Sequence, residues 1–415
     1  MTYELQTLRS VRVYVEPAGS YGVDGSGTPA NFIDLPISEG FAMGAPSRDM
    51  LDPMLSQVRA DGRAERIPGK RTAALQMSML LASHGVDMAG TETPPAATTW
   101  ALRRVLGAIM GGVALTGTTA AVTTVQAGTT ATAVTVTATH GARWSPGSVI
   151  ACVVGGVLEA REVLSVAGDV VSVKEAFSAA PTTGQNVRGG VTFFPTEDPD
   201  SSLQFIAQGR ELSENFLYRG MQGSFQIEAK PGQLAKATFD LKGCAATKLA
   251  DHSGINVPSI SNWSPIAVVA STLTVPTVGS TTRTQVLATD VSLQLGFAYE
   301  PITGYGGTET IIRMRRQRPR EGVIAKFTFD VPYEDSTWID ARDQQLDRAV
   351  FLQLGNVAGA TVLISLPTVQ VVDVQRGQTS GGVSGQKVVC ESRLDSSAAA
   401  GTTEQRYAAF RLHMV

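Results

Sequence analysis

Alternation of apolar and polar residues is the dominant pattern of this chain, and it predicts many short β-strands. Val11 to Val15 alternates in this way, and a second clear case runs from Lys70 to Leu81. Successive side chains of a strand point to opposite faces, so this alternation is typical of a strand with one buried face. The same criterion predicts strands at 203–207, 223–229, 235–241, 290–299, 322–331, 361–374, 385–393 and 404–415.

Two segments have the spacing of apolar residues that indicates a helix. The first runs from about Thr98 to Met110 and the second from about Ser336 to Leu354, where Gly355 supplies a stop signal. Trp100 and Trp338 stand near the starts of these helices on their apolar faces. We therefore expect both tryptophans to anchor the helices in the core. Many strands with few helices predict a mainly β fold of layers, each flanked by a helix.

The order of the predicted elements occurs twice. Gly40-Phe41-Ala42 precedes a strand and then a helix that begins with Thr99-Trp100. Gly296-Phe297-Ala298 likewise precedes a strand and then a helix that begins with Thr337-Trp338. Internal repetition on this scale predicts two related domains.

A long, charged, turn-rich arm follows each Gly-Phe-Ala, at about Met43 to Gly69 and Glu300 to Glu321. A competing similarity relates residues 235–240 to residues 325–330. Only the first alignment preserves the order of strand, arm, strand, helix and further strands, so we favour it.

The first of these domains is interrupted. Leu115 to Gly190 is rich in Thr, Ala and Val and nearly free of aromatic residues, which predicts a small all-β module. A stretch rich in Ser, Thr, Pro and Val then reads as a linker, with room for an edge strand. The expected organisation is a first domain of residues 1–114 and 191–255, an inserted module at 115–190, a linker at 256–281 and a second domain at 282–415.

Composition and charge exclude several classes of protein. The chain of 415 residues is too long for one ordinary core, and its apolar content of 43% excludes a disordered protein. A net charge of −3 argues against an electrostatic nucleic-acid binder. No secretory signal and no run of 18 apolar residues is visible, so we expect no membrane insertion.

Motifs that carry chemistry are not recognisable. The four histidines are isolated, and Cys152, Cys244 and Cys390 lie too far apart for a metal motif. Gly62 to Arg71 resembles a phosphate loop only superficially, because its spacing is wrong and a strand follows. We therefore expect no catalytic residues, no cofactor and no metal, and a protein that is not an enzyme.

One cluster of charge stands out: Arg313, Arg315, Arg316, Arg318 and Arg320. It has three interpretations: a solvated loop, a surface that docks on an acidic partner, or a contact with nucleic acid. The last is the weakest, because no aromatic residues are interleaved and the chain is slightly acidic.

The residues from Gly223 to Gly243 resemble the closing strand pair of the tail-tube (major tail) proteins of long-tailed bacteriophages, a strand–turn–strand that ends in Phe-x-x-x-Gly. Ile67 to Ser78 resembles the strand of that family that enters the helix, and the inserted module resembles the immunoglobulin-like or small β modules that many members display. The resemblance implies two tandem tail-tube domains, each of packed antiparallel sheets with a flanking helix.

Further expectations follow from the resemblance. Three copies with two tube domains each would form a homotrimeric ring with pseudo-sixfold symmetry, and a hexamer is expected if the chain is not duplicated. Rings would stack into the tail tube of the virion, assembled in the cytoplasm of the bacterial host. Tape-measure, baseplate and tail-terminator proteins are the implied partners, and DNA would pass through the lumen without specific binding.

The resemblance also assigns roles to parts of the chain. The arms and the arginine cluster are candidates for contacts between rings, and the inserted module would project outward, so that its deletion should leave assembly intact. Two alternatives remain: another β protein of a tail, baseplate or secretion-system tube, and a carbohydrate-binding β protein. Self-polymerisation favours the tube, whereas clustered carboxylates and exposed aromatic residues would favour the last.

Overall fold

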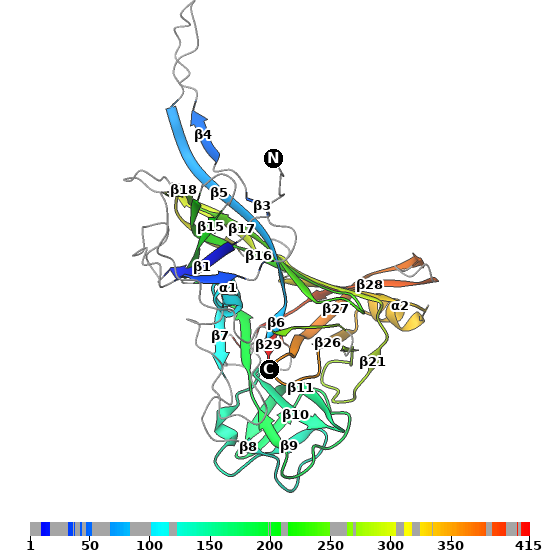
Figure 1. Cartoon of the computed structure of the whole chain (residues 1–415). Coiled ribbons are helices and arrows are strands. Elements are labelled where there is room, and N and C mark those ends of the chain that lie inside the picture. The colour runs from blue at the N-terminus through cyan, green and yellow to red at the C-terminus, as the bar shows by residue number, and fades with distance from the viewer. Residues whose placement is uncertain are drawn as a thin grey trace, which may run out of the picture.

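Antiparallel strands make up most of the protein, so the prediction of a mainly β fold is confirmed (Figure 1). In this computed structural model the described residues are 10–16, 32–35, 37, 42–43, 47–51, 67–83, 101–115, 123–197, 199, 201–208, 215–249, 264–268, 271–303, 311–317, 324–333, 335–378, 384–395, 405 and 408–415.

The elements fall into a first series, an inserted module and a second series. The first series comprises β1 (Ser10–Glu16), β2 (Ile33–Leu35), β3 (Ala42–Met43), β4 (Ser47–Leu51), β5 (Ile67–Leu80), β6 (Ala82–Ser83), α1 (Ala101–Met110), β7 (Gly111–Leu115), β14 (Val191–Pro195), β15 (Ser202–Gln208), β16 (Asn215–Ala229), β17 (Lys236–Gly243) and β18 (Ala245–Leu249). The module comprises β8 (Thr123–Thr124), β9 (Ala133–Thr135), a short 3-10 helix (Gly141–Arg143), β10 (Val149–Val154), β11 (Val157–Ala167), β12 (Val170–Val173) and β13 (Asn186–Arg188). The second series comprises β19 (Ser264–Pro265), β20 (Thr272–Thr274), β21 (Gln285–Val286), β22 (Asp290–Leu295), β23 (Ala298–Thr303), β24 (Ile311–Gln317), β25 (Ala325–Val331), α2 (Ser336–Asp343), β26 (Asp347–Leu354), β27 (Val362–Gln378), β28 (Ser384–Ser392) and β29 (Arg411–Met414).

The two series have the same order of paired strands. In the first series the order is β2-β1-β15-β16-β17-β5-β3. In the second series it is β21-β20-β26-β27-β28-β25-β22. The chain visits the members of both series in the same sequence, and each helix lies between the equivalent strands, α1 after β5 and α2 after β25.

The equivalence extends to single residues. An offset of 149 converts the pair Phe225 and Phe239 of β16–β17 into Val374 and Val388, which are paired in β27–β28. This correspondence agrees with the alignment that preserves element order. It disagrees with the competing similarity between residues 235–240 and 325–330, because those residues lie in β17 and β25, which are not equivalent strands.

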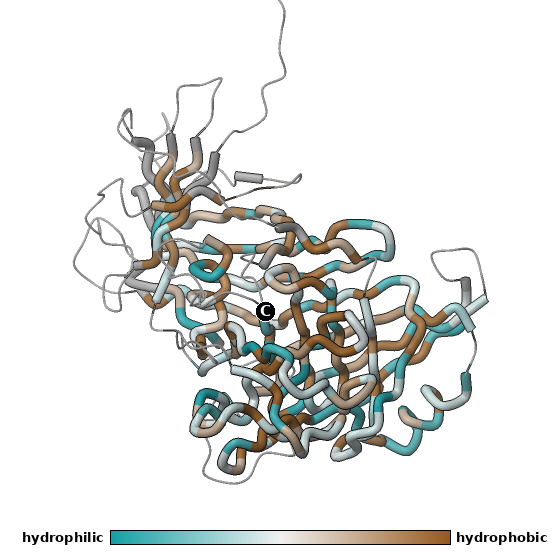
Figure 2. Tube along the Cα trace, turned by 60° about the horizontal axis from the view of Figure 1, so that its bottom comes forward, coloured by the Kyte–Doolittle hydropathy of each residue, from teal (hydrophilic) through white to brown (hydrophobic). Residues whose placement is uncertain are grey.

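Strand pairing joins the two series, since β14 pairs with β29, β6 with β19 and β16 with β22. The second half of β16 pairs with β22, from Gln226 opposite Gln294 to Ala229 opposite Val291. Buried and more exposed residues alternate along β22, and Figure 2 shows brown and teal segments alternating along the chain. The apolar faces of both series, together with α1 and α2, share one large core.

Both helices reach this core through their apolar faces. In α1 the side chains of Val105, Leu106 and Ile109 are completely buried. In α2 Trp338 is 5% exposed, and its ring meets the ring of Phe329 edge-on at a centroid distance of 5.2 Å. Trp100 lies outside the described residues.

The predicted helix at 336–354 is half wrong. The helix ends at Asp343, Gln345 has a positive φ of 53°, and residues 347–354 form β26 between β20 and β27. Six consecutive residues of β26, from Ala349 to Leu354, are buried, which requires contact on both faces and suits a central strand. The stretch expected to be a linker also contains strands, since β19 and β20 lie at 264–265 and 272–274.

The inserted module is a small closed barrel. Its strands have the order β8-β13-β10-β11-β12-β9, and a bridge between Val125 and Val136 brings the last strand back to the first. Closure removes exposed sheet edges, which would otherwise pair with other chains. Trp144 lies in the interior among valines, and its Nε1 donates to the carbonyl of Val149 at 3.1 Å.

Candidate functional site: the joints between the parts of the chain

Most of the buried charged groups of the described residues lie at two joints, one between the second series and the first and one between the inserted module and the second series. The first joint is formed by the β23–β24 hairpin, called here the second arm. This hairpin lies between β22 and β25 in the chain. Arg316 of this arm is 7% exposed.

Arg316 binds the C-terminal end of α1. Its guanidinium donates to the carbonyls of Ile109 and Met110, the last two residues of the helix, and to the carbonyl of Thr196 at 2.6 Å. It also lies over the ring of Phe297 at 3.9 Å. The last carbonyls of a helix have no partner within it and carry partial negative charge, so a cation stabilises this end.

Apolar contacts complete the arm joint. Met314 packs with Cys244, which directly follows β17, and with Tyr299. The hydroxyl of Tyr299 accepts a hydrogen bond from Nη2 of Arg316 at 3.1 Å. The described part of the second arm therefore lies on the first series of its own chain.

This placement corrects one expectation about the arginine cluster. Arg316 is buried within the subunit, so we withdraw it as a contact between rings. Arg315 is exposed on β24. Arg313 lies in β24 with its side chain outside the description, and Arg318 and Arg320 lie outside the described residues.

The second joint seats the inserted module on the second series. The outer face of β10 and β11 packs against β26, β27 and the C-terminus, and the two sides share an apolar cluster. This cluster consists of Val149, Ala151, Leu158 and Ala160 from the module and Ala349, Phe351, Leu363 and Val415 from the second series. An outward projection from a tube stays a prediction, but within the subunit the module is not a separate appendage.

Beside this apolar cluster lies a closed network of four charges. Arg411 binds Glu162 at 2.7 Å and Asp395 at 3.1 Å, and Lys174 binds Glu162 at 3.0 Å and also contacts Asp395. The side chains of Arg411 and Glu162 are completely buried. Two acids and two bases balance, which is the condition under which charges are tolerated in a protein interior.

The network controls ionisation at the joint. Burial alone would raise the pKa of Glu162, but Arg411 and Lys174 outweigh it and hold the pKa well below its ordinary value. Burial lowers the pKa of His413, against the opposing influence of Glu162, whose Oε2 lies 3.9 Å from its Nε2. Nδ1 of His413 is within hydrogen-bond distance of the hydroxyl of Thr192, at 2.9 Å.

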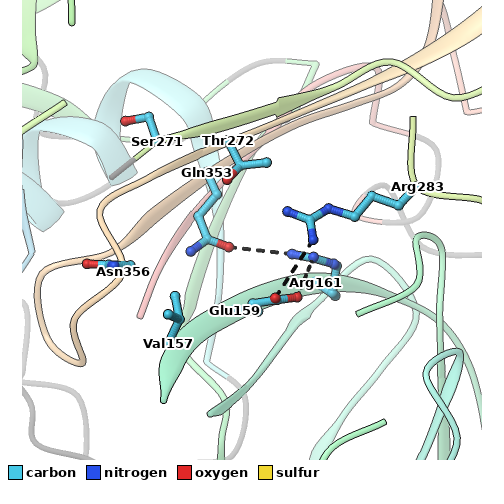
Figure 3. Close-up of a pocket in the computed structure, with 8 residues that line it drawn as sticks. All are labelled: Val157, Glu159, Arg161, Ser271, Thr272, Arg283, Gln353 and Asn356. Atoms are coloured by element: carbon cyan, nitrogen blue, oxygen red, sulfur yellow. Dashed lines mark hydrogen bonds and ion pairs between the residues drawn. The ribbon is translucent and has the colours of Figure 1, made fainter. Parts of the chain in front are cut away.

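A cleft of about 190 Å³ opens between the module and the second series (Figure 3). Glu159 accepts from Arg161 at 2.6 Å and lies 3.9 Å from Arg283. Oε1 of Gln353 accepts from the guanidinium of Arg161 at 3.5 Å and from the amide of Ala160 at 3.0 Å. Arg283 and Gln353 of the second series thus contact the module across the cleft, which makes it part of the module joint.

The cysteines are inert in this environment. All three are free and buried, and burial raises the pKa of Cys152 and Cys390 to about 12. Within the described residues, no group of three or more His, Cys, Asp and Glu side chains could hold a metal ion. No helix in the described part of the chain is long and apolar enough to cross a membrane.

Comparison with models of known protein families and with curated proteins finds no match. The residues of the two joints are also largely absent from the sequence-based candidates. Glu162, Lys174, Asp395 and Arg411 are spread over 250 positions, so no local motif announces them. Arg316 was among the sequence-based candidates, but for a contact between rings and not for a contact with the end of α1.

Proposed function

We propose that this protein is the structural subunit of a stacked-ring tube, with two tandem tail-tube domains, as its resemblance to phage tail-tube proteins implies. One observation carries the proposal: two series with the same strand order are joined edge to edge through β16 and β22. Such a joint, repeated between copies, adds units in a circle and covers the sheet edges. Three chains would supply six units, a homotrimeric ring with pseudo-sixfold symmetry.

The polar face of the joined sheet supports the passage of DNA. At the boundary between the series this face forms a shallow hollow of about 210 Å³. Glu228, Asp290 and Asp330 alternate there with Lys230 and Lys387, and Lys230 lies 3.6 Å from Asp290. Tight DNA binding requires several cations aimed at phosphates, so a surface of mixed charge lets DNA slide.

The proposal includes the remaining assignments. The tube would belong to the virion tail and assemble in the cytoplasm of the host, with tape-measure, baseplate and tail-terminator proteins as partners. The subunit would contribute structure and no catalysis, and it would bind no cofactor.

Electron microscopy of the purified full-length protein at high concentration tests the proposal. We expect hollow tubes of stacked rings, with threefold class averages that contain six similar lobes. Rings that close but do not stack would favour a tail terminator or baseplate component. Protein that remains monomeric at every concentration, and also when a preformed tail end is added as an initiator, would contradict the proposal.

A further inference from the structure

The seat of the second arm on the first series has an equivalent in the second series. Met314 of the arm packs on Cys244, and the offset of 149 residues relates Cys244 to Arg393, which directly follows β28. The amide of Cys244 donates to the carbonyl of Arg219 at 3.0 Å, and the amide of Arg393 donates to the carbonyl of Thr368 at 2.8 Å. The same offset relates Arg219 to Thr368, so the two seats share an equivalent backbone hydrogen bond, which we call their matching design.

The equivalent seat carries exposed leucines. Leu394, the next residue after Arg393, is 65% exposed, and Leu346, between α2 and β26, is 39% exposed. The guanidinium of Arg393 lies 3.5 Å from the carboxylate of Asp347, the neighbour of Leu346. Both leucines therefore lie at one end of β26 and β28, beside the C-terminal end of α2. Exposed leucines gain stability when a partner covers them.

The chain also contains a second hairpin of the same kind. β4 pairs with the beginning of β5, from Ser47 opposite Thr72 to Leu51 opposite Ile67, and we call this hairpin the first arm. In the chain the first arm lies between β3 and the part of β5 that pairs with β3. In the same way, the second arm lies between β22 and β25. Figure 1 shows β4 and the beginning of β5 standing away from the other strands.

The two arms differ in the surface that each one contacts. The second arm lies on the series that comes before its own in the chain. The first arm belongs to the first series, and among the described strands β4 pairs with β5 alone. Among the described residues the second seat of this design lies on the second series, and another copy of the chain can present it to the first arm.

We propose that the first arm of one copy lies on the second series of a neighbouring copy, at Leu394, Leu346 and the C-terminal end of α2. The contact reproduces, between copies, the joint that the second arm makes within one chain. It is heterologous, because arm and seat are different surfaces, and it closes into a ring when the third copy meets the first. The arms thus connect neighbours within a ring, which deepens the proposed function and rests on it.

Cross-linking between two variants tests this contact. One preparation carries Ser47→Cys, at the base of the first arm, where the equivalent part of the second arm meets its seat. The other carries Leu394→Cys. The native cysteines are buried, so the introduced thiols alone react with a short bismaleimide. We expect a covalent dimer that contains one chain of each kind, identified by mass spectrometry of the joined peptides.

A matched control uses Ser47→Cys with Val357→Cys. Val357 is 62% exposed and lies in the turn after β26, at the opposite end of the strand from Leu346. Thiols held together in a complex have a raised effective concentration, so the Leu394 pair should give about tenfold more dimer or better. Equal yields, or no dimer with either pair, would overturn the proposal.

A second measurement separates this proposal from the proposed function. Leu394→Glu should abolish rings in electron micrographs, whereas Val357→Glu should keep them, with both variants folded by circular dichroism. Rings that form with Leu394→Glu and without the cross-link would contradict the arm contact and leave the tube intact. Absence of rings in the unmodified protein as well, also when a preformed tail end is added as an initiator, would contradict both.

Discussion

The joint of the second arm and the joint of the inserted module both depend on an arginine, but the two arginines meet different partners. Arg316 meets backbone carbonyls at the end of α1, which carry only partial charge. Arg411 meets the full charges of Glu162 and Asp395 in a site closed to water. The difference teaches which joint is the more fragile. Removal of Arg411 leaves buried carboxylates without their cation, whereas removal of Arg316 leaves only backbone carbonyl dipoles without a donor.

The largest effect is expected from deletion of the module. Replacing residues 115–190 by a short glycine-serine linker would expose Phe351 and Leu363 to water and leave Arg411 without Glu162. We expect the second series to fail to fold, seen as insoluble protein or as loss of cooperative unfolding. This reverses the outcome that the sequence favoured. A soluble deletion variant that unfolds cooperatively would show that the module joint is dispensable.

Arg411→Met should be the most damaging single change. It leaves Glu162 and Asp395 buried with Lys174 as their remaining cation, and loss of one partner of a buried pair costs about 3–5 kcal/mol. Urea denaturation measures the change in the free energy of unfolding. Arg342→Met is the control, because its pair with Asp343 is solvent-exposed and its loss should change the free energy of unfolding far less. Equal losses in the two variants would refute the special role of the network.

Arg316→Met should have a smaller effect. The methionine keeps some contact with Phe297, but the carbonyls of Ile109 and Met110 lose a charged donor, which costs about 1.5–3 kcal/mol. The same urea titration measures it, and hydrogen exchange should show faster opening at the end of α1. Arg315→Met, on the exposed side of β24, should cost less than Arg316→Met, because interactions of a solvent-exposed arginine contribute little. A loss at Arg315 as large as that at Arg316 would mean that burial is not the cause.

The smallest effect concerns pH. Burial holds the pKa of His413 below its ordinary value of 6.5, so the unfolded chain binds a proton before the folded chain does. The stability that neutral, buried His413 contributes is complete above pH 6.5. It is lost as the pH falls through the pKa of His413 in the folded protein. Glu162 keeps its charge over this range, because its pKa lies well below 4.5. His413→Gln should therefore flatten the decline of the melting temperature below pH 6.5, and an unchanged decline would assign it to other groups.

Strands were the most predictable part of the fold. Val11 to Val15 and residues 235–241 alternate because successive side chains of a strand face opposite ways. The first stretch lies in β1, and the second lies in β17 from Lys236 onward. Residues 347–354 misled the same approach. Their apolar residues also fit a helical face, and only the contacts of β26 with β20 and β27 decide for a strand.

The joints were less predictable than the strands. Five arginines crowd into residues 313–320, and no local pattern indicates that Arg316 is the buried one. Glu162 and Arg411 are ordinary charged residues in their own segments. They form a pair only because β11 packs beside β29 and β27, and this packing brings together positions 249 residues apart.

The sequence by itself determined which stretches form strands, the order in which the elements recur, and the change of composition at the inserted module. These properties are local, because they follow from backbone geometry and from the residues within a few positions. The tertiary structure alone decided that the two series share an edge, that the second arm lies on α1, and that the module is held by a buried charge network. Such contacts depend on which distant segments exclude water together, and a charged side chain carries no mark of the partner that will neutralise it.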